Sequence, residues 1–187
     1  MNVRLSIGMD APDLVALLVP HRNCAYNLAR WLMRNSDDAE DVVQEAYARA
    51  FRYASGFRGG DPRAWLLAIV RNTCFAWLRK AGTSGPVEAF DEEVHSHEVS
   101  RSNPEQQLLR RADTALAEAA LAALPARFRE VLVLREMEDL SYKEMSAVLG
   151  VPIGTVMSTL SRARERLRQT ARQMLVAPGS RSDPVAS

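Results

Sequence analysis

The sequence contains little that would build a disulfide-bonded, membrane-spanning or β-rich protein. Cys24 and Cys74 are the only cysteines and form no CxxC motif, so reduced thiols packed as small apolar side chains are expected. No uninterrupted apolar stretch approaches the roughly 20 residues of a transmembrane helix. Residues 1–10 lack the apolar core of a signal peptide. We therefore expect a cytoplasmic protein with no segment inserted in a membrane.

Charge of one sign is also scarce, because 24 basic and 23 acidic residues leave a net charge of +1. The charges are unevenly spread, however. Residues 1–80 hold 11 basic and 8 acidic side chains, residues 81–104 hold 1 and 5, and residues 105–187 hold 12 and 10. Two mildly basic halves thus flank an acidic middle, and only local clustering can argue for a nucleic-acid partner.

Strand patterns are nearly absent and helical periodicity is nearly continuous, which predicts an all-α fold. Residues 81–104 interrupt this periodicity with a composition rich in Gly, Ser, Pro and acid, as is typical of a flexible linker. We therefore expect two small helical domains, residues 12–80 and residues 105–176, joined by this acidic linker. Residues 177–187 have the composition of a disordered tail.

The first domain is expected to contain three helices. The opening helix has apolar residues at three- and four-residue steps over 14–32 and should break at Asn35–Ser36. Ser36 is the expected N-cap of a second helix that runs through Arg52, and a third should span 63–80. The second helix should bury a stripe formed by Val42, Val43, Ala46, Ala50 and Tyr53.

The second domain carries the pattern of a helix-turn-helix. One helix should end at Leu124–Pro125 and another should span 126–138. Ser141 and Glu144 then fit the capping box S-x-x-E, and the staple that accompanies such a box would be formed by Leu140 and Met145. Gly150 fits the end of this helix, and Pro152 suits the first turn of the next. Two helices that meet at so short a turn are typical of DNA-binding proteins.

The last helix has one apolar and one small polar face. At 100° per residue, its core-facing stripe consists of Val156, Leu160, Ala163 and Leu167. Opposite lie Gly154, Ser158, Ser161 and Glu165. Arginines flank this polar face on both sides, with Arg162 and Arg166 on one side and Arg164 and Arg168 on the other. The arrangement suits a helix in the major groove, with small side chains at the base edges and arginines at the phosphates.

Arginine-rich helix ends are also common as solvated faces, because cations complement the helix dipole and pair with nearby acids. Here the capped helix, the short turn and the apolar stripe accompany the arginines, so we favour DNA binding over that alternative.

Three segments resemble one protein family. LPARFREVLVLREMEDLSYKEMSAVLGVPIGTVMSTLSRARERLR (124–168) resembles the promoter −35-binding domain of the bacterial extracytoplasmic-function (ECF, group IV) sigma factors of the sigma-70 family. DDAEDVVQEAYARAF (37–51) resembles the helix with which such factors contact the clamp helices of RNA polymerase. PRAWLLAIVRNTCFAWLRK (62–80) resembles their −10-binding helix. The order and spacing of the three segments agree with the family, which makes the resemblance more specific than a lone helix-turn-helix.

The resemblance implies a sigma factor that binds core RNA polymerase, recognises double-stranded −35 and melted −10 promoter DNA, and promotes promoter melting. Catalysis would belong to the polymerase, so neither an enzyme nor a cofactor is expected. A bacterial cytoplasmic location and an anti-sigma factor as partner are also implied. The alternatives are a dimeric helix-turn-helix repressor or activator, and a sigma-like decoy that titrates an anti-sigma factor.

For −35 DNA, the base-reading candidates are Thr155, Ser158, Ser161 and Arg162. The phosphate-binding candidates are Arg164, Arg166 and Arg168. Met157 and Thr159 stand where many relatives carry a basic residue, so the −35 sequence does not follow from this helix.

For −10 DNA, the candidates mix cations for the strand backbone with aromatic and amide groups for an unstacked base: Arg63, Trp65, Arg71, Asn72, Phe75, Arg79 and Lys80. The resemblance implies that Asn72 and the loop 59–63 take the flipped base. Trp65 could instead be a core residue, and Trp77, at helical spacing from Val70 and Thr73, is expected in the core.

For RNA polymerase, the resemblance implies contacts from Asp38, Asp41, Gln44 and Glu45. An exposed acidic stripe suits a basic helical partner. The alternative is stabilisation of the helix N-terminus, which would be enough to explain Asp37 and Asp38.

Two histidine patterns invite a metal interpretation that we do not favour. His21 and Cys24 lie one helical turn apart, but two ligands make no site and helix packing explains them better. His95 and His97 alternate in the linker and are expected to be solvated. We expect no metal.

Overall fold

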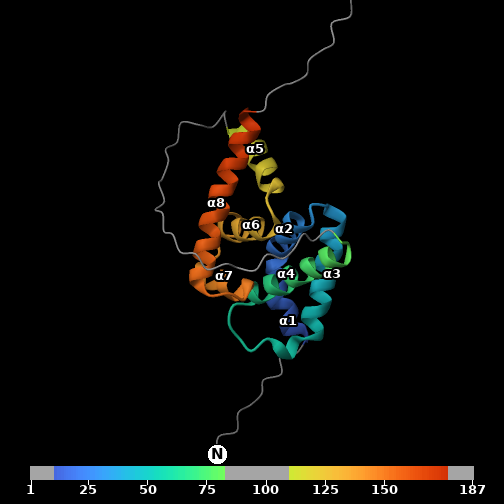
Figure 1. The fold of residues 1–187 in the computed structure, drawn as a ribbon. Helices are drawn as coiled ribbons and strands as arrows, with labels where there is room; N and C mark the ends of the chain where they lie inside the picture. The colour runs from blue at the N-terminus through green and yellow to red at the C-terminus, as the bar shows by residue number, and fades with distance from the viewer. Residues whose placement is uncertain (1–10, 83–109, 177–187) are drawn as a thin grey trace, which may run out of the picture.

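The computed structural model describes residues 11–82 and 110–176, and every regular element in those two ranges is helical (Figure 1). The all-α prediction is therefore confirmed for the described residues. The tail and His95 and His97 lie outside them, and of the linker only Ala81 and Gly82 are described. The domain boundaries at 12–80 and 105–176 stay predictions.

The opening helix is broken where one continuous helix was expected. It forms α1 (Ala11–Leu18), a 3₁₀ turn η1 (Val19–His21) and α2 (Arg22–Met33). Pro20 lies in the 3₁₀ turn, where its missing N–H and its ring prevent a regular α-helix from continuing. The prediction of a single helix was wrong because it followed apolar spacing across this proline.

The helix α3 (Ser36–Arg52) begins one residue earlier than the predicted cap implies. The N-cap is Asn35, whose side-chain oxygen accepts a hydrogen bond from the Asp37 backbone N–H at 2.9 Å, so the prediction of Ser36 was wrong. The residue before it, Arg34, has φ 63° and turns the chain between α2 and α3. The buried stripe on α3 is confirmed at its first four positions, but Tyr53 follows the helix and is 60% exposed, so its predicted burial was wrong.

A 3₁₀ turn, η2 (Ala54–Gly56), and an exposed loop lead to α4 (Pro62–Lys80), which matches the predicted third helix to within one residue. The Asp61 carboxylate accepts a hydrogen bond from the Arg63 N–H at 2.9 Å and caps the helix, while Pro62 occupies its first turn. The fully buried core of this half comes from all its α-helices and includes Leu14, Leu28, Val42, Leu66 and Val70.

The second half contains α5 (Arg110–Ala123), α6 (Ala126–Leu132), a π-helical turn η3 (Val133–Met137), α7 (Tyr142–Leu149) and α8 (Ile153–Val176). The capping box is confirmed by both of its hydrogen bonds. Glu144 N–H donates to Ser141 Oγ at 3.3 Å, and Ser141 N–H donates to Glu144 Oε2 at 2.7 Å. Gly150 ends α7 with φ 70°, which a glycine adopts without strain. Pro152 precedes α8 by one residue, outside the first turn predicted for it.

The two halves pack directly against each other. Helix α6 lies beside α2, and α7 lies beside α4 (Figure 1). The apolar side chains buried in both halves belong to one continuous cluster. This packing places the face of α4 that was predicted to bind −10 DNA next to the second half.

Candidate functional site

The outward face of α8 has the composition predicted for a groove-binding helix. The core stripe is confirmed, with Val156, Leu160 and Ala163 at most 1% exposed and Leu167 half-buried. Gly154 is exposed and an added Cβ there would meet nothing within 4 Å. Ser158 and Ser161 are half-buried on the same side of the helix. A close approach by a base edge is therefore sterically open along this face.

Among the base-reading candidates, Thr155 differs from the others. It is only 8% exposed and lies with Thr159, at 3%, on the buried side of α8. Thr155, a predicted base-reading candidate, is buried because the core contact of α8 is wider than the four-residue stripe. Met157, by contrast, is 51% exposed and Ile153 is 45% exposed. Sequence reasoning left both outside the candidate set, although two apolar residues on an otherwise polar face were a usable signal.

Two arginines of α8 form ion pairs with glutamates of the second half. Arg164 donates to Glu136 Oε1 through Nη2 at 2.7 Å, and Arg168 reaches Glu165 one turn away at 2.5 Å. The Arg168 side chain is 58% exposed, and Arg166 is exposed as well. Exposed ion pairs of this kind contribute little to stability, so an incoming phosphate can replace the carboxylates at small cost.

The candidates on α4 fall into two groups. Asn72, Arg79 and Lys80 are exposed. Arg63 and Arg71 instead point at the second half, and both form ion pairs with glutamates from α6–η3 and its C-cap. The predicted −10 residues are thus on one helix, but they are not equally accessible.

Arg71 is fixed from two sides. Its Nε lies 3.0 Å from Glu130 Oε2 and its Nη2 lies 3.2 Å from Glu130 Oε1. This is a bidentate arginine–carboxylate pair, which is among the stronger charge-assisted contacts. The guanidinium also lies over the ring of Phe75 at 4.9 Å. The Glu130 side chain is 1% exposed. Burial raises the pKa of its carboxyl to about 7, even though the Arg71 charge acts to lower it.

Arg63 forms the second contact across the halves. Its Nη2 lies 3.0 Å from Glu138 Oε2 and also donates to the backbone carbonyl of Glu138. Asn27 Nδ2, from α2, donates to Glu138 Oε1 at 3.1 Å. The Glu138 side chain is 7% exposed. Both of its carboxylate oxygens are therefore occupied by donors from the first half.

The tryptophans of α4 pack against the core and are only partly exposed. Trp65 is half-buried and packs against the core and against Phe57, with ring centroids 5.2 Å apart. Trp77 also packs against the core, as expected, but its Nε1 donates to Glu45 Oε2 at 2.6 Å. That bond, together with the Arg49 charge, lowers the pKa of Glu45.

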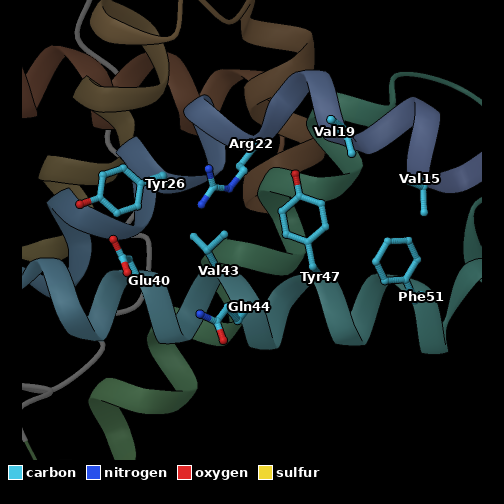
Figure 2. A pocket seen from close by; sticks show the side chains of 9 residues that line it. All are labelled: Val15, Val19, Arg22, Tyr26, Glu40, Val43, Gln44, Tyr47 and Phe51. Carbon is cyan, nitrogen blue, oxygen red and sulfur yellow. The ribbon is translucent and has the colours of Figure 1, made fainter.

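The polymerase candidates on α3 also differ in how exposed their side chains are. Asp41 and Gln44 are exposed, Asp38 is half-buried, and Glu45 is engaged by Trp77 and Arg49. Gln44 borders a hollow of about 440 Å³ between α3 and the α1–η1–α2 segment. Figure 2 shows the side chains that line it. Phe51, 38% exposed, lines the same hollow. Sequence reasoning missed the aromatic part of this surface because it considered only polar residues.

Metal binding finds no support at His21 and Cys24, since the Cys24 thiol donates to the His21 backbone carbonyl at 2.9 Å. Within residues 11–82 and 110–176, no group of three or more His, Cys, Asp or Glu side chains is arranged to hold a metal ion. No helix of this described part has the length and apolarity that crossing a bilayer requires.

Comparison with protein families gives two matches, one in each half. A family model described as Sigma-70 region 2 matches residues 17–83. A model described as Sigma-70, region 4 matches residues 114–167. The first match covers α2, α3 and α4, and the second covers the capped helix-turn-helix.

Several curated proteins are similar over most of the chain. The chain is 37% identical over 157 residues to the ECF RNA polymerase sigma factor SigE of Mycolicibacterium smegmatis, which covers 84% of this chain and 61% of that relative's length. It is 35% identical over 139 residues to the ECF RNA polymerase sigma-E factor of Escherichia coli K12, covering 71% and 73%. It is 32% identical over 170 residues to the RNA polymerase sigma-H factor of Pseudomonas aeruginosa, covering 87% of each chain.

Solved structures show the same fold. The sigma factor RpoE of Bartonella quintana, in complex with the anti-sigma factor NepR, superposes with a TM-score of 0.64 at 29% identity, covering 87% of this chain and 98% of RpoE. CnrH, in complex with the cytosolic domain of CnrY, superposes with a TM-score of 0.58 at 24% identity, covering 93% and 94%.

Proposed function

Because the chain belongs to the ECF RNA polymerase sigma factors, we propose that it binds core RNA polymerase, recognises −10 and −35 promoter elements and promotes promoter melting. One observation in the structure carries the proposal further than family membership. The capped helix α7, the turn at Gly150 and the exposed arginine-flanked face of α8 form a complete helix-turn-helix.

At the −35 element, α8 lies in the major groove. Ser158, Ser161 and Arg162 face base edges, while the remaining arginines bind phosphates: Arg164, Arg166 and Arg168. Thr155, which is buried, supports the helix rather than reading a base.

At the −10 element, α4 and the loop before it receive the melted strand. Asn72, Arg79 and Lys80 are the exposed residues that meet it first. Gly59 and Gly60, with φ of 86° and 102°, give the loop a backbone shape that larger residues would resist. The remaining contacts come from Arg63, Trp65, Arg71 and Phe75.

Core polymerase binds along α3. Asp41 and Gln44 supply exposed polar contacts, Asp38 adds a half-buried one, and the hollow beside Phe51 accepts an apolar side chain of the partner (Figure 2). Glu45 acts chiefly by fixing Trp77 and Arg49. Catalysis belongs to the polymerase, and the factor acts in the bacterial cytoplasm. An anti-sigma factor is its expected regulator, because RpoE of Bartonella quintana, a structural neighbour, was solved with one.

Run-off transcription with purified core RNA polymerase on a promoter library tests this proposal. The expected result is initiation at a subset of promoters that share −10 and −35 sequences. Absence of specific initiation by the full chain would refute the sigma-factor assignment. If the chain instead binds a palindromic duplex as a dimer without polymerase, a repressor or activator is favoured. Tight anti-sigma binding without initiation would favour a decoy.

A further inference from the structure

A hydrogen bond joins the helix assigned to polymerase to the helix assigned to −10 DNA. The Trp77 indole Nε1, on α4, donates to Glu45 Oε2, on α3, at 2.6 Å. The two residues are 32 positions apart in the chain. The bond therefore fixes the position of one helix relative to the other.

Both oxygens of the Glu45 carboxylate are engaged within the chain. Oε2 accepts from Trp77, and Oε1 accepts from Arg49 Nε at 2.9 Å, one turn further along α3. The Trp77 bond, the Arg49 contact and the nearby charge of Lys80 lower the pKa of Glu45. The carboxylate is thus ionised at neutral pH, and an ionised acceptor strengthens the bond from Trp77. A polymerase side chain that took Oε2 would leave the indole N–H without its partner.

Trp77 lies where α4 ends. Its ring packs against the core, and its backbone carbonyl accepts a hydrogen bond from the Ala81 N–H at 2.9 Å, which closes the last turn of the helix. That turn carries Arg79 and Lys80, and both side chains are exposed. Fixing the indole therefore fixes the turn that presents these two cations.

Two exposed side chains of α4 that are assigned to the melted strand lie on the other side of the helix from Trp77. At about 100° per residue, Asn72 and Arg79 lie within about 20° of each other around the helix axis, whereas Trp77 lies about 140° from Asn72. Asn72 and Arg79 are exposed, and Trp77 is half-buried. One side of α4 is thus held by α3 while the other presents polar groups to solvent.

We propose that Glu45 is a positioning residue for promoter melting and not a contact for core polymerase. Through Trp77, it holds the last turns of α4 in the orientation in which their exposed side chains receive the melted −10 strand. The inference deepens the proposed function and rests on it, since it takes α4 as the −10-binding helix. Asp41 and Gln44, exposed on α3 beside Glu45, keep the contact with polymerase.

Melting is the step that depends most on this arrangement. A melted strand can always return to its duplex, so its capture requires side chains that are already in place. Ordering them during capture would cost conformational entropy, and the ends of helices fray. Loss of the bond at Trp77 therefore slows promoter opening, whereas docking of polymerase on the exposed side of α3 does not need it.

The test separates promoter opening from polymerase binding. For the full chain and its variants, 2-aminopurine in the −10 element reports the opening rate at saturating core RNA polymerase, on a promoter selected by run-off transcription. Affinity is measured on immobilised core polymerase. Glu45→Ala and Trp77→Phe each remove the bond and should each slow opening by roughly tenfold, the usual effect of losing a hydrogen bond to a charged group. Neither should weaken binding to core polymerase.

Further variants distinguish positioning from a general loss of structure. The double variant should lose no more than either single one, because both act through the same bond. Glu45→Gln keeps an oxygen that can accept from Trp77 and should restore most of the opening rate. Arg49→Ala is the matched control, because it removes the other partner of Glu45, an exposed pair, and leaves the Trp77 bond in place. It should open the promoter as fast as wild type.

Slower opening by Glu45→Ala and Trp77→Phe, with rescue by Glu45→Gln, supports the positioning role. Weaker binding of Glu45→Ala to polymerase with an unchanged opening rate would overturn it in favour of a direct contact. Equal opening rates in all variants, even with a lower melting temperature, would also overturn it, as would additive losses in the double variant. Failure of the proposed function looks different, because the wild-type chain itself would then open no promoter.

Discussion

The arginines of α8 and those of α4 have different surroundings although both are assigned to promoter DNA. On α8, Arg168 is 58% exposed and its partner is one turn away. On α4, Arg71 is 19% exposed and its partner is a buried glutamate 59 positions along the chain. Arg168 is therefore accessible in the described conformation, whereas the Arg71 guanidinium is already engaged by a carboxylate of the other half.

The largest expected effect comes from Arg71→Ala. Above the Glu130 pKa of about 7, it leaves the Glu130 carboxylate buried without a counter-charge, and breaking such a pair typically costs about 4 kcal/mol. Arg168→Ala is the counterpart on α8 and should cost less than about 1 kcal/mol, because its pair is exposed. Chemical denaturation of both variants measures the difference. Equal losses would remove the contrast between the two surfaces.

The second largest expected effect is on the pH dependence of stability, which should differ between the arginine pairs of α4 and those of α8. Glu130 faces Arg71 and Cys74, and burial raises the pKa of the Cys74 thiol to about 12. Burial raises the pKa of Glu130 from 4.5 to about 7. Its stabilising contribution is thus complete below pH 4.5 and is lost as the pH rises to about 7, by about 3 kcal/mol.

The measurement is the free energy of unfolding of wild type minus that of Glu130→Gln between pH 4.5 and pH 7.5. The subtraction is needed because Glu45 and Glu144 have lowered pKa values. Their contributions to the free energy of unfolding therefore increase with rising pH, opposite to that of Glu130. A difference that does not change over this range would contradict the burial assigned to Glu130.

On the open surface, Arg168→Ala should weaken −35 duplex binding by roughly tenfold and lower the slope of log affinity against log salt by about 0.9. The loss should be similar on all promoters, because a phosphate contact carries no base information. Arg162→Ala should instead change the preferred −35 sequence. If neither variant changes promoter binding, the groove assignment of α8 is wrong.

The smallest expected effect concerns Met157, which is 51% exposed on the DNA-facing side of α8. If α8 binds the major groove as proposed, an apolar side chain there suits a thymine methyl group. Replacing one −35 thymine at a time by deoxyuridine should cost about fourfold in affinity at a single position, the value of one buried methyl. Met157→Ala should abolish that sensitivity, and Met174→Ala, 37% exposed near the end of α8, should leave it intact. Equal sensitivity in all three proteins would exclude the methyl contact.

The sequence predicted the local parts of this structure well. The capping box at Ser141, the turn at Gly150 and the apolar stripe of α8 each depend on residues within a few positions, and all three were confirmed. Errors arose where neighbouring residues compete for one role: Asn35 caps α3 in place of Ser36, and Pro20 breaks a helix whose apolar spacing continues past it.

The interface between the halves could not be predicted in this way. Glu130 and Glu138 look like ordinary polar positions, since their partners lie 59 and 75 residues away and local periodicity carries no information about them. A single signal was present, because Glu130 interrupts an apolar run in LPARFREVLVL. The same limit explains why the ion pairs of Arg63 and Arg71 with the second half were not foreseen.

The most direct test of the account is the distance between the halves before and after polymerase binds. Spin labels at Asn23→Cys on α2 and Gln173→Cys on α8 occupy exposed positions, while the native Cys24 and Cys74 are buried and their pKa values are raised by burial. The account predicts one narrow, short distance distribution in the free chain. It predicts a longer distribution once core RNA polymerase and promoter DNA are added. A distribution that stays the same in a transcribing complex would contradict the assignment of Arg63 and Arg71 to −10 DNA, because both side chains form ion pairs with the second half in the described structure.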